Sequence, residues 1–112
     1  MVNKSDFNFS IVIPIFNERD NIGNLIKEII HQINKNYNYE IIIVDDASTD
    51  DVNNIMREFD SVDFIKIIKN TTNLGQSQSI KNGIINSRFE NIITIDGDGQ
   101  NDPADIPKLI DL

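Results

Sequence analysis

Residues 40–46 read Glu-Ile-Ile-Ile-Val-Asp-Asp, an apolar run of β-type residues that ends in two carboxylates. Residues 92–102 repeat this pattern as Ile-Ile-Thr-Ile-Asp-Gly-Asp-Gly-Gln-Asn-Asp. The glycines in the second run let the chain turn, so that Asp96 and Asp98 can converge on one hard divalent cation. In an α/β sheet, ligands bind where strands end. The two runs therefore predict an α/β sheet with an acidic ligand site at the ends of its strands.

Short β-type runs alternate with segments of helical period along the chain. Strands are predicted at 9–16, 40–44, 62–68 and 91–95. Between them, apolar residues recur at helical spacing: Ile22, Leu25, Ile26, Ile29, Ile30 and Ile33, then Val52, Ile55, Met56 and Phe59, then Ile80 and Ile84 in a helix at 76–87. Residues 48–51, Ser-Thr-Asp-Asp, are typical of a cap for the second helix. This order predicts a three-layer α/β/α fold with a mostly parallel sheet and helices on both faces.

The last residues predict the start of a further helix. Asp102 is suited to the N-cap, Pro103 to the first helical position and Asp105 to the first turn. The helix then reaches Leu112 without a C-cap. We therefore expect the chain to be the N-terminal part of a longer protein.

Composition excludes several classes of function. The 112 residues suffice for one domain with an apolar core. A net charge of −8 argues against a nucleic-acid groove, which needs a basic stripe, although a bridging metal would still allow a diphosphate to bind. Cysteine is absent, which excludes disulfides, thiolate catalysis and cysteine-type zinc sites. No run approaches the roughly 20 apolar residues of a membrane helix, and no signal peptide is present, so a cytoplasmic protein is predicted.

Four blocks, in order, closely resemble the family 2 glycosyltransferases of GT-A fold. They are residues 10–18 (Ser-Ile-Val-Ile-Pro-Ile-Phe-Asn-Glu), 43–50 (Ile-Val-Asp-Asp-Ala-Ser-Thr-Asp), 73–75 (Asn-Leu-Gly) and 96–103 (Asp-Gly-Asp-Gly-Gln-Asn-Asp-Pro). The nearest likeness is to the branch of dolichol-phosphate mannosyltransferase and other polyprenyl-phosphate glycosyltransferases, and it extends from about Phe9 to the last residue. The resemblance implies that residues 1–112 form the Rossmann-like, nucleotide-sugar-binding half of a GT-A domain, truncated at its C-terminal end.

The resemblance also implies which residues meet the nucleotide sugar. They are Pro14, Phe16, Glu18, Val44, Asp46, Asp96, Gly97 and Asp98. The family usually has Tyr where Phe16 stands, so a hydroxyl contact is missing and ring stacking must serve instead. Asp46 matches the aspartate that accepts a hydrogen bond from the base, and Asp45 is expected to fix the loop. The plainer alternatives are that Asn17 and Glu18 only lead into a helix, and that Asp45, Asp46 and Ser48 only cap the second helix.

By the same resemblance, Asp96, Asp98 and Gln100 hold Mg²⁺ or Mn²⁺, which grips the diphosphate of the donor. The family usually has Ala where Gly97 stands. Since glycine is conformationally free, this departure is expected to make the loop more flexible and to weaken the site.

The implied function is an inverting transfer of a hexose from a UDP- or GDP-sugar to an acceptor, with polyprenyl phosphate favoured. No catalytic residue is assigned within the chain, which we expect to be inactive alone. Membrane association would come only from a region beyond Leu112, which would place the whole protein at the cytoplasmic face of a membrane, and an exposed sheet edge would favour homo-oligomers. The alternatives are a soluble family 2 transferase acting on a cell-surface polysaccharide or protein, and a nucleotide- and metal-binding scaffold without activity.

Other acidic-loop families fit less well. An EF-hand counted from Asp96 needs Gly at position six and Glu at position twelve, where the chain has Asn101 and Pro107. A haloacid-dehalogenase-type phosphatase has Asp-x-Asp-Gly-Thr after its first strand, whereas here Gln100 is fifth and the strand is the fourth. A phospho-receiver domain has its acidic pair after the first strand, not the second.

Four further residues are given structural roles. His31 has no second ligand at metal-binding spacing and is predicted to be a surface residue. Lys66 and Lys69 alternate with Ile and are predicted on the solvent side or edge of the sheet. Gly75, in a loop that in the family lies near the nucleotide, is predicted to supply a turn of positive φ.

Overall fold

The predicted order of elements is confirmed in the computed structural model, which describes residues 8–33 and 37–97. Within these residues the elements are β1 (Asn8–Ile15), α1 (Arg19–Gln32), β2 (Asn38–Asp45), α2 (Val52–Met56), β3 (Ile65–Lys69), α3 (Gln76–Ile85) and β4 (Ile92–Thr94). The third strand begins three residues later than predicted, because the chain turns before it. The helix predicted to start at Asp102 lies outside the described residues.

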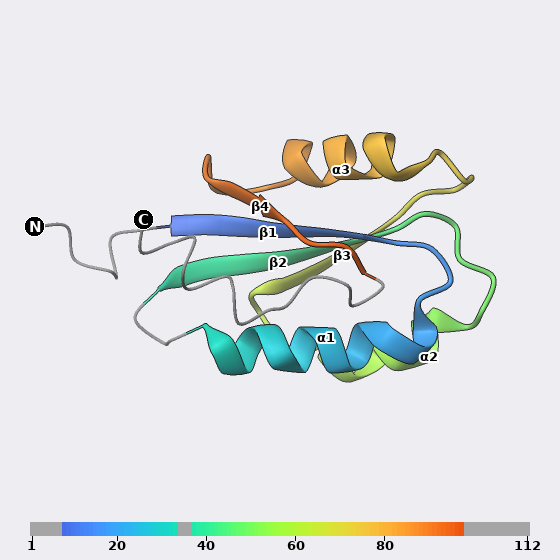
Figure 1. Cartoon of the computed structure of the whole chain (residues 1–112), viewed down its shortest axis with the longest axis horizontal. Coiled ribbons are helices and arrows are strands. Elements are labelled where there is room, and N and C mark those ends of the chain that lie inside the picture. Colours follow the sequence, from blue (N-terminus) through green and yellow to red (C-terminus); the bar gives the residue numbers. More distant parts are fainter. Residues whose placement is uncertain (1–7, 34–36, 98–112) are drawn as a thin grey trace, which may run out of the picture.

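The sheet has the strand order β3-β2-β1-β4, and every pairing is parallel. The first two crossovers lead from β1 to β2 and from β2 to β3. The third runs in the opposite direction, from β3 past β2 and β1 to β4. Since crossover connections keep one hand, this reversal moves the last helix to the opposite face. Figure 1 shows α1 and α2 on one side of the sheet and α3 on the other. The switch point of the sheet therefore lies between β1 and β4.

One face of the sheet carries most of the apolar core. Here α1 buries Ile22, Leu25, Ile26 and Ile29, at the spacing that the sequence predicted. The strands supply alternate residues to the same cluster, among them Phe9, Ile11, Ile13, Ile15, Ile41 and Ile43. Val52, Met56 and Phe59, from α2 and the 3-10 turn after it (Arg57–Phe59), complete this face.

The opposite face is thinner and is packed differently. Its buried apolar cluster consists of Val12, Ile42 and Val44, and the residues that α3 buries are Ser79 and Gly83. A Cβ on Gly83 would lie 2.4 Å from Val12 Cγ1 and 3.1 Å from Val44 Cγ2. The helix backbone thus lies directly on the strands. The apolar stripe predicted for this helix is therefore partly wrong: Ile84 is 43% exposed, because small residues face the sheet in its place.

The cap predicted at residues 48–51 is also wrong. Asp51 stands at the N-cap of α2 with φ +64°, and no side chain caps this helix. The helix has one α-helical turn and then tightens into the 3-10 turn that buries Phe59.

Instead, residues 48–50 are joined to the loop after β1. Ser48 Oγ accepts a hydrogen bond from Asn17 N (2.9 Å), and Asn17 Oδ1 accepts one from Thr49 N (2.8 Å). Asp50 Oδ2 accepts a third from Arg19 N (2.8 Å), one of the free amides of the first turn of α1. These acidic and hydroxyl side chains therefore fasten the loop after β2 to the loop after β1, at the edge of the sheet where the strands end.

The remaining structural predictions are confirmed. His31 is exposed on α1, and Lys66 and Lys69 are exposed on β3, an edge strand. Gly75 precedes α3 with φ +93°. In residues 8–33 and 37–97, no helix combines the length and apolar character needed to span a membrane.

Candidate functional site

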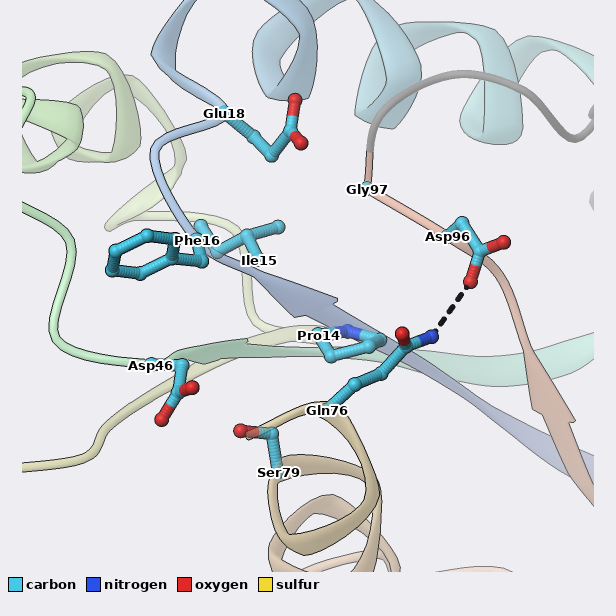
Figure 2. A pocket seen from close by; sticks show the side chains of 9 residues that line it. All are labelled: Pro14, Ile15, Phe16, Glu18, Asp46, Gln76, Ser79, Asp96 and Gly97. Carbon is cyan, nitrogen blue, oxygen red and sulfur yellow. Dashed lines mark hydrogen bonds between the residues drawn. The ribbon is translucent and has the colours of Figure 1, made fainter. Parts of the chain in front are cut away.

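A pocket of about 210 Å³ opens where the strands end, at the switch point of the sheet. Its walls come from the loop after β1, the end of β2, the first turns of α3 and the residues after β4 (Figure 2). The lining residues are Pro14, Ile15, Phe16, Glu18, Asp46, Gln76, Ser79, Asp96 and Gly97. The volume is below the 300–1,000 Å³ of typical small-molecule sites, so the pocket by itself is too small to enclose a ligand as large as a nucleotide sugar.

Most of the predicted site residues in the described part of the chain meet in this pocket. They are Pro14, Phe16, Glu18, Asp46, Asp96 and Gly97. Val44 does not line it, because its side chain is fully buried against Gly83 of α3. Asp98 and Gln100 lie outside the described residues.

The loop after β1 presents one aromatic and one acidic side chain to the pocket. Phe16 is 46% exposed and lines the pocket, so part of its side chain is accessible to a ligand there. Glu18 precedes α1, and its Oε2 accepts a hydrogen bond from Asn21 Nδ2 (2.9 Å). Its backbone oxygen accepts the first amides of the helix, from Asn21 and Ile22. Glu18 therefore both leads into the helix and lines the pocket, so the plainer alternative describes part of its role.

Asp45 and Asp46 fix two different loops. Asp45 Oδ1 accepts a hydrogen bond from Ser48 N (3.0 Å), which confirms that Asp45 holds its own loop. Asp46 reaches the segment before α3: its Oδ1 accepts from Leu74 N (2.7 Å) and its Oδ2 from Gly75 N (2.9 Å). Neither carboxylate caps α2, so the plainer alternative for this pair is wrong.

Asn70 extends the network around Asp46. Its Nδ2 donates to Asp46 Oδ1 (2.9 Å) and lies 3.0 Å from Ser79 Oγ, while its Oδ1 accepts from Asn82 Nδ2 (3.2 Å). An ionised carboxylate offers about four acceptor positions. Most of those on Asp46 are therefore already used inside the protein.

This network sets the charge of Asp46. Burial alone would raise the pKa of Asp46, but hydrogen bonds from Leu74 N, Asn70, Gly75 N and Ser79 outweigh it and lower the pKa below its ordinary value of 3.8. Asp46 is thus an anion, 4% exposed, at the wall of the pocket.

Asp96 follows β4 and faces the first turn of α3. Gln76 Nε2 donates to Asp96 Oδ1 (3.0 Å), a contact that crosses the pocket between residues 20 positions apart (Figure 2). The sequence analysis did not identify Gln76, Ser79 or Ile15 as lining residues. A signal for the first two was present, because Gln76, Ser79 and Gly83 recur at i, i+3 and i+7 and form a polar and small stripe on one face of the helix.

Gly97 is explained by packing. A Cβ at this position would lie 2.5 Å from Ile15 Cγ2 and 2.9 Å from the carbonyl oxygen of Pro14. Gly97 is also buried. The structure thus gives a reason for glycine that the sequence analysis did not consider: the turn after β4 lies against the end of β1, and there is no room for a side chain between them.

The chemistry of the donors at this turn fits a hard divalent cation. Asp96 offers carboxylate oxygen, and the two further predicted ligands, Asp98 and Gln100, offer carboxylate and amide oxygen. The described residues alone contain no group of three or more His, Cys, Asp or Glu side chains that could hold a metal. The described part therefore contributes one of the three predicted ligands, Asp96, and places it in the pocket.

Residues 10–112 match the family model described as "Glycosyl transferase family 2". Among similar proteins, the dodecaprenyl-phosphate galacturonate synthase of Rhizobium johnstonii is 36% identical over 104 residues, which cover 90% of this chain and 31% of that protein. The undecaprenyl-phosphate 4-deoxy-4-formamido-L-arabinose transferase of Pseudomonas savastanoi is 36% identical, with 92% and 32% covered. The dolichol-phosphate mannosyltransferase of Pyrococcus furiosus is 34% identical, with 91% and 29% covered. The chain thus spans about a third of the length of these relatives.

Solved structures share the fold. The S. aureus protein TarS (residues 1–349, in complex with UDP) superposes with a TM-score of 0.73 at 24% identity, covering 82% of this chain and 28% of that one. The mannosyltransferase PcManGT from Pyrobaculum calidifontis, in complex with GDP-Man and Mn²⁺, gives 0.72 at 18% identity, covering 87% and 30%. At these identities the likeness establishes the GT-A architecture of the described residues.

Proposed function

Because the chain belongs to glycosyl transferase family 2, we propose that it forms the nucleotide-sugar site of a transferase that moves a hexose from a UDP- or GDP-sugar to polyprenyl phosphate. One observation carries this proposal: Asp96, the exposed ring of Phe16 and the buried, anionic Asp46 line one pocket at the switch point of a parallel sheet. The switch point is where open α/β sheets bind nucleotides.

The pocket walls suggest how the nucleoside is held. The open ring of Phe16 suits stacking on a base, which contributes binding energy without a hydroxyl contact. Glu18 supplies an acceptor for a ribose or base donor. Asp46 would accept a base N–H at an acceptor position that the loop before α3 leaves unused, and it would also hold that loop against the base.

The diphosphate is assigned to the Asp96 side of the pocket. Asp96, Asp98 and Gln100 would hold Mg²⁺ or Mn²⁺ there, and the bound metal would neutralise the charge of the diphosphate leaving group. The chain carries a net charge of −8, so a diphosphate at this site needs such a cation between two negative partners.

The names of the relatives support polyprenyl phosphate as the acceptor. The three proteins described above carry dodecaprenyl, undecaprenyl or dolichol phosphate in their names. A phosphate oxygen is already nucleophilic, so such an acceptor needs less help from a general base than a sugar hydroxyl would. A lipid-borne acceptor would bring the whole protein to the cytoplasmic face of a membrane.

The proposal is tested by calorimetric titration of UDP and GDP into this chain, with and without Mn²⁺. We expect one of the two nucleotides to bind, and Mn²⁺ to strengthen its binding by at least about tenfold, since the metal bridges two anionic partners. The variant Asp96→Asn keeps the size of the side chain and should lose the Mn²⁺-dependent gain.

Asp63→Asn is the matched control, because Asp63 is exposed and does not line the pocket. It should bind as the unaltered chain does. Binding of neither nucleotide, or an Mn²⁺-dependent gain that survives Asp96→Asn, would contradict the proposed site.

A further inference from the structure

Gln76 and Asp96 approach each other across the pocket from different elements. Gln76 is the first residue of α3, and Asp96 follows β4. The 3.0 Å hydrogen bond from Gln76 Nε2 to Asp96 Oδ1 is drawn in Figure 2, which shows both side chains directed toward each other. The predicted metal ligand in the described part of the chain is therefore held by a neutral amide.

A neutral donor has a particular effect on a ligating carboxylate. A hydrogen bond to an ionised oxygen is stronger than one between neutral groups, so it restricts the rotation of the carboxylate. A glutamine amide does this without adding positive charge, and the carboxylate keeps its full charge for a cation. Partners of this kind orient ligating residues, and their loss commonly weakens metal binding by about 10- to 100-fold.

The position of Gln76 is itself fixed by the protein. Asp46 binds the amides of Leu74 and Gly75, immediately before Gln76. Ser79 N donates to Gly75 O (3.1 Å), and Ser79 is fully buried against the sheet. The glutamine side chain thus starts from a backbone that is held before any ligand binds.

We propose that Gln76 is a positioning residue for the metal-binding carboxylate of Asp96, an inference that rests on the proposed metal site. Through it, the Asp46 network on the base side of the pocket is linked to the metal side. Gln76 sets the orientation of Asp96 and so determines how tightly the site holds a divalent cation.

The test is a titration of this chain with Mn²⁺ alone, followed by the electron paramagnetic resonance signal of free Mn²⁺. Gln76→Ala removes the donor and should weaken Mn²⁺ binding by about 10- to 100-fold. Gln76→Lys retains a donor but adds a positive charge, so it should weaken binding further, because the ammonium competes with the cation for Asp96.

Gln78 provides matched controls on the same helix. It is exposed, and its Nε2 donates to Asn82 Oδ1 (3.1 Å), away from Asp96. Gln78→Ala should leave Mn²⁺ binding within about twofold. Gln78→Lys makes the same change in net charge as Gln76→Lys, so it shows how much of the loss comes from long-range repulsion alone.

A second readout separates positioning from a structural effect. Gln76→Ala should weaken Mn²⁺ binding by a larger factor than it weakens binding of the nucleotide without metal. Mn²⁺ binding that is equal in both chains would overturn the role of Gln76 and leave the proposed function intact. An equal loss of Mn²⁺ and of metal-free nucleotide binding would overturn it too, because the residue would then be structural. Failure of the unaltered chain to bind Mn²⁺ would overturn both proposals.

Discussion

The two faces of the sheet are built on opposite plans. The face under α1 and α2 is filled by large apolar side chains from the strands and from both helices, including Ile22, Ile26 and Ile29 of α1. The face under α3 has three buried apolar residues, and the helix meets them with Ser79 and Gly83. Burial of apolar area is the main source of stability in folding. The first face therefore carries most of the stability.

The face under α3 instead allows the helix to lie close to the sheet. Because α3 lies directly on Val12 and Val44, its first turn reaches the ends of the strands, where Gln76 and Ser79 line the pocket. A layer of large side chains would hold the helix farther from the sheet, at the roughly 10 Å spacing of ordinary layers. The comparison indicates that one face of the sheet serves stability and the other places a helix terminus at the site.

The largest expected effect is a loss of stability on the face under α1 and α2. Ile26→Ala removes a fully buried side chain from the main core and should lower the free energy of unfolding by about 2–5 kcal/mol. Urea denaturation followed by circular dichroism measures this. In the folded fraction, nucleotide binding should be unchanged, because Ile26 does not line the pocket.

Ile84→Ala is the matched change on the other face. Since Ile84 is 43% exposed, it should cost much less than Ile26→Ala. Equal losses for the two variants would show that both faces carry similar stability and would contradict the comparison.

Gly83→Ala is expected to lower stability less than Ile26→Ala does. Unlike Ile26→Ala, it is also expected to weaken nucleotide binding. The added Cβ would lie 2.4 Å from Val12 Cγ1, so α3 must shift away from the sheet. Overpacking of this kind costs about 1–3 kcal/mol. Because the shift also moves Gln76 and Ser79, which line the pocket, nucleotide binding measured by calorimetry in the presence of Mn²⁺ should weaken as well.

Gly23→Ala on α1 provides the control. A Cβ there would lie 3.2 Å from the half-buried Ile55 Cγ2, a contact that a small adjustment can relieve. Alanine also favours the helix over glycine by up to about 1 kcal/mol. We expect this variant to bind nucleotide normally and to differ little in stability; weaker nucleotide binding in it would argue against the special role of the α3 face.

Apart from the controls, the smallest expected effect on stability is that of Asp46→Asn, about 1–2 kcal/mol near neutral pH, because an amide replaces a carboxylate that accepts several hydrogen bonds. The folded pKa of Asp46 lies below its ordinary value of 3.8, so the ionised form stabilises the fold above pH 3.8, and this contribution is lost as the pH falls through the lower folded pKa.

Urea denaturation of both chains at several pH values tests this sign. The difference between the unaltered chain and Asp46→Asn should be constant above about pH 5 and should shrink below pH 3.8. A difference that stays constant at low pH would show that the Asp46 network does not depend on the charge of the carboxylate.

The sequence predicted the elements of the fold well because two strong periods are present. Isoleucines of α1 recur at helical spacing, and the β-type runs are bounded by polar turns. The cap of α2 was predicted wrongly because Ser48 and Asp50 bond to a loop about 31 residues away, a contact that local pattern cannot reveal. For the same reason, the buried side of α3 was assigned to Ile84 rather than to Gly83.

The candidate site was predicted in part. The acids after β2 and β4 could be identified because ligands bind at the carboxyl ends of strands in an open α/β sheet. Gln76 and Ser79 were not identified, because the sequence alone does not show whether their polar stripe on α3 faces the sheet or the solvent. Val44 was included with its motif, although its side chain points to the opposite face of the strand from the core under α1 and is buried under α3.

The sequence by itself determined the alternation of strands and helices, the acidic strand ends and membership of a family. It could do so because these follow from local period and from short motifs. Only the tertiary structure decided which strand is the neighbour of β1, which face α3 covers, and that Gln76 meets Asp96. These depend on contacts between segments far apart in the chain, in which the absence of a Cβ at Gly83 or Gly97 is as decisive as any side chain.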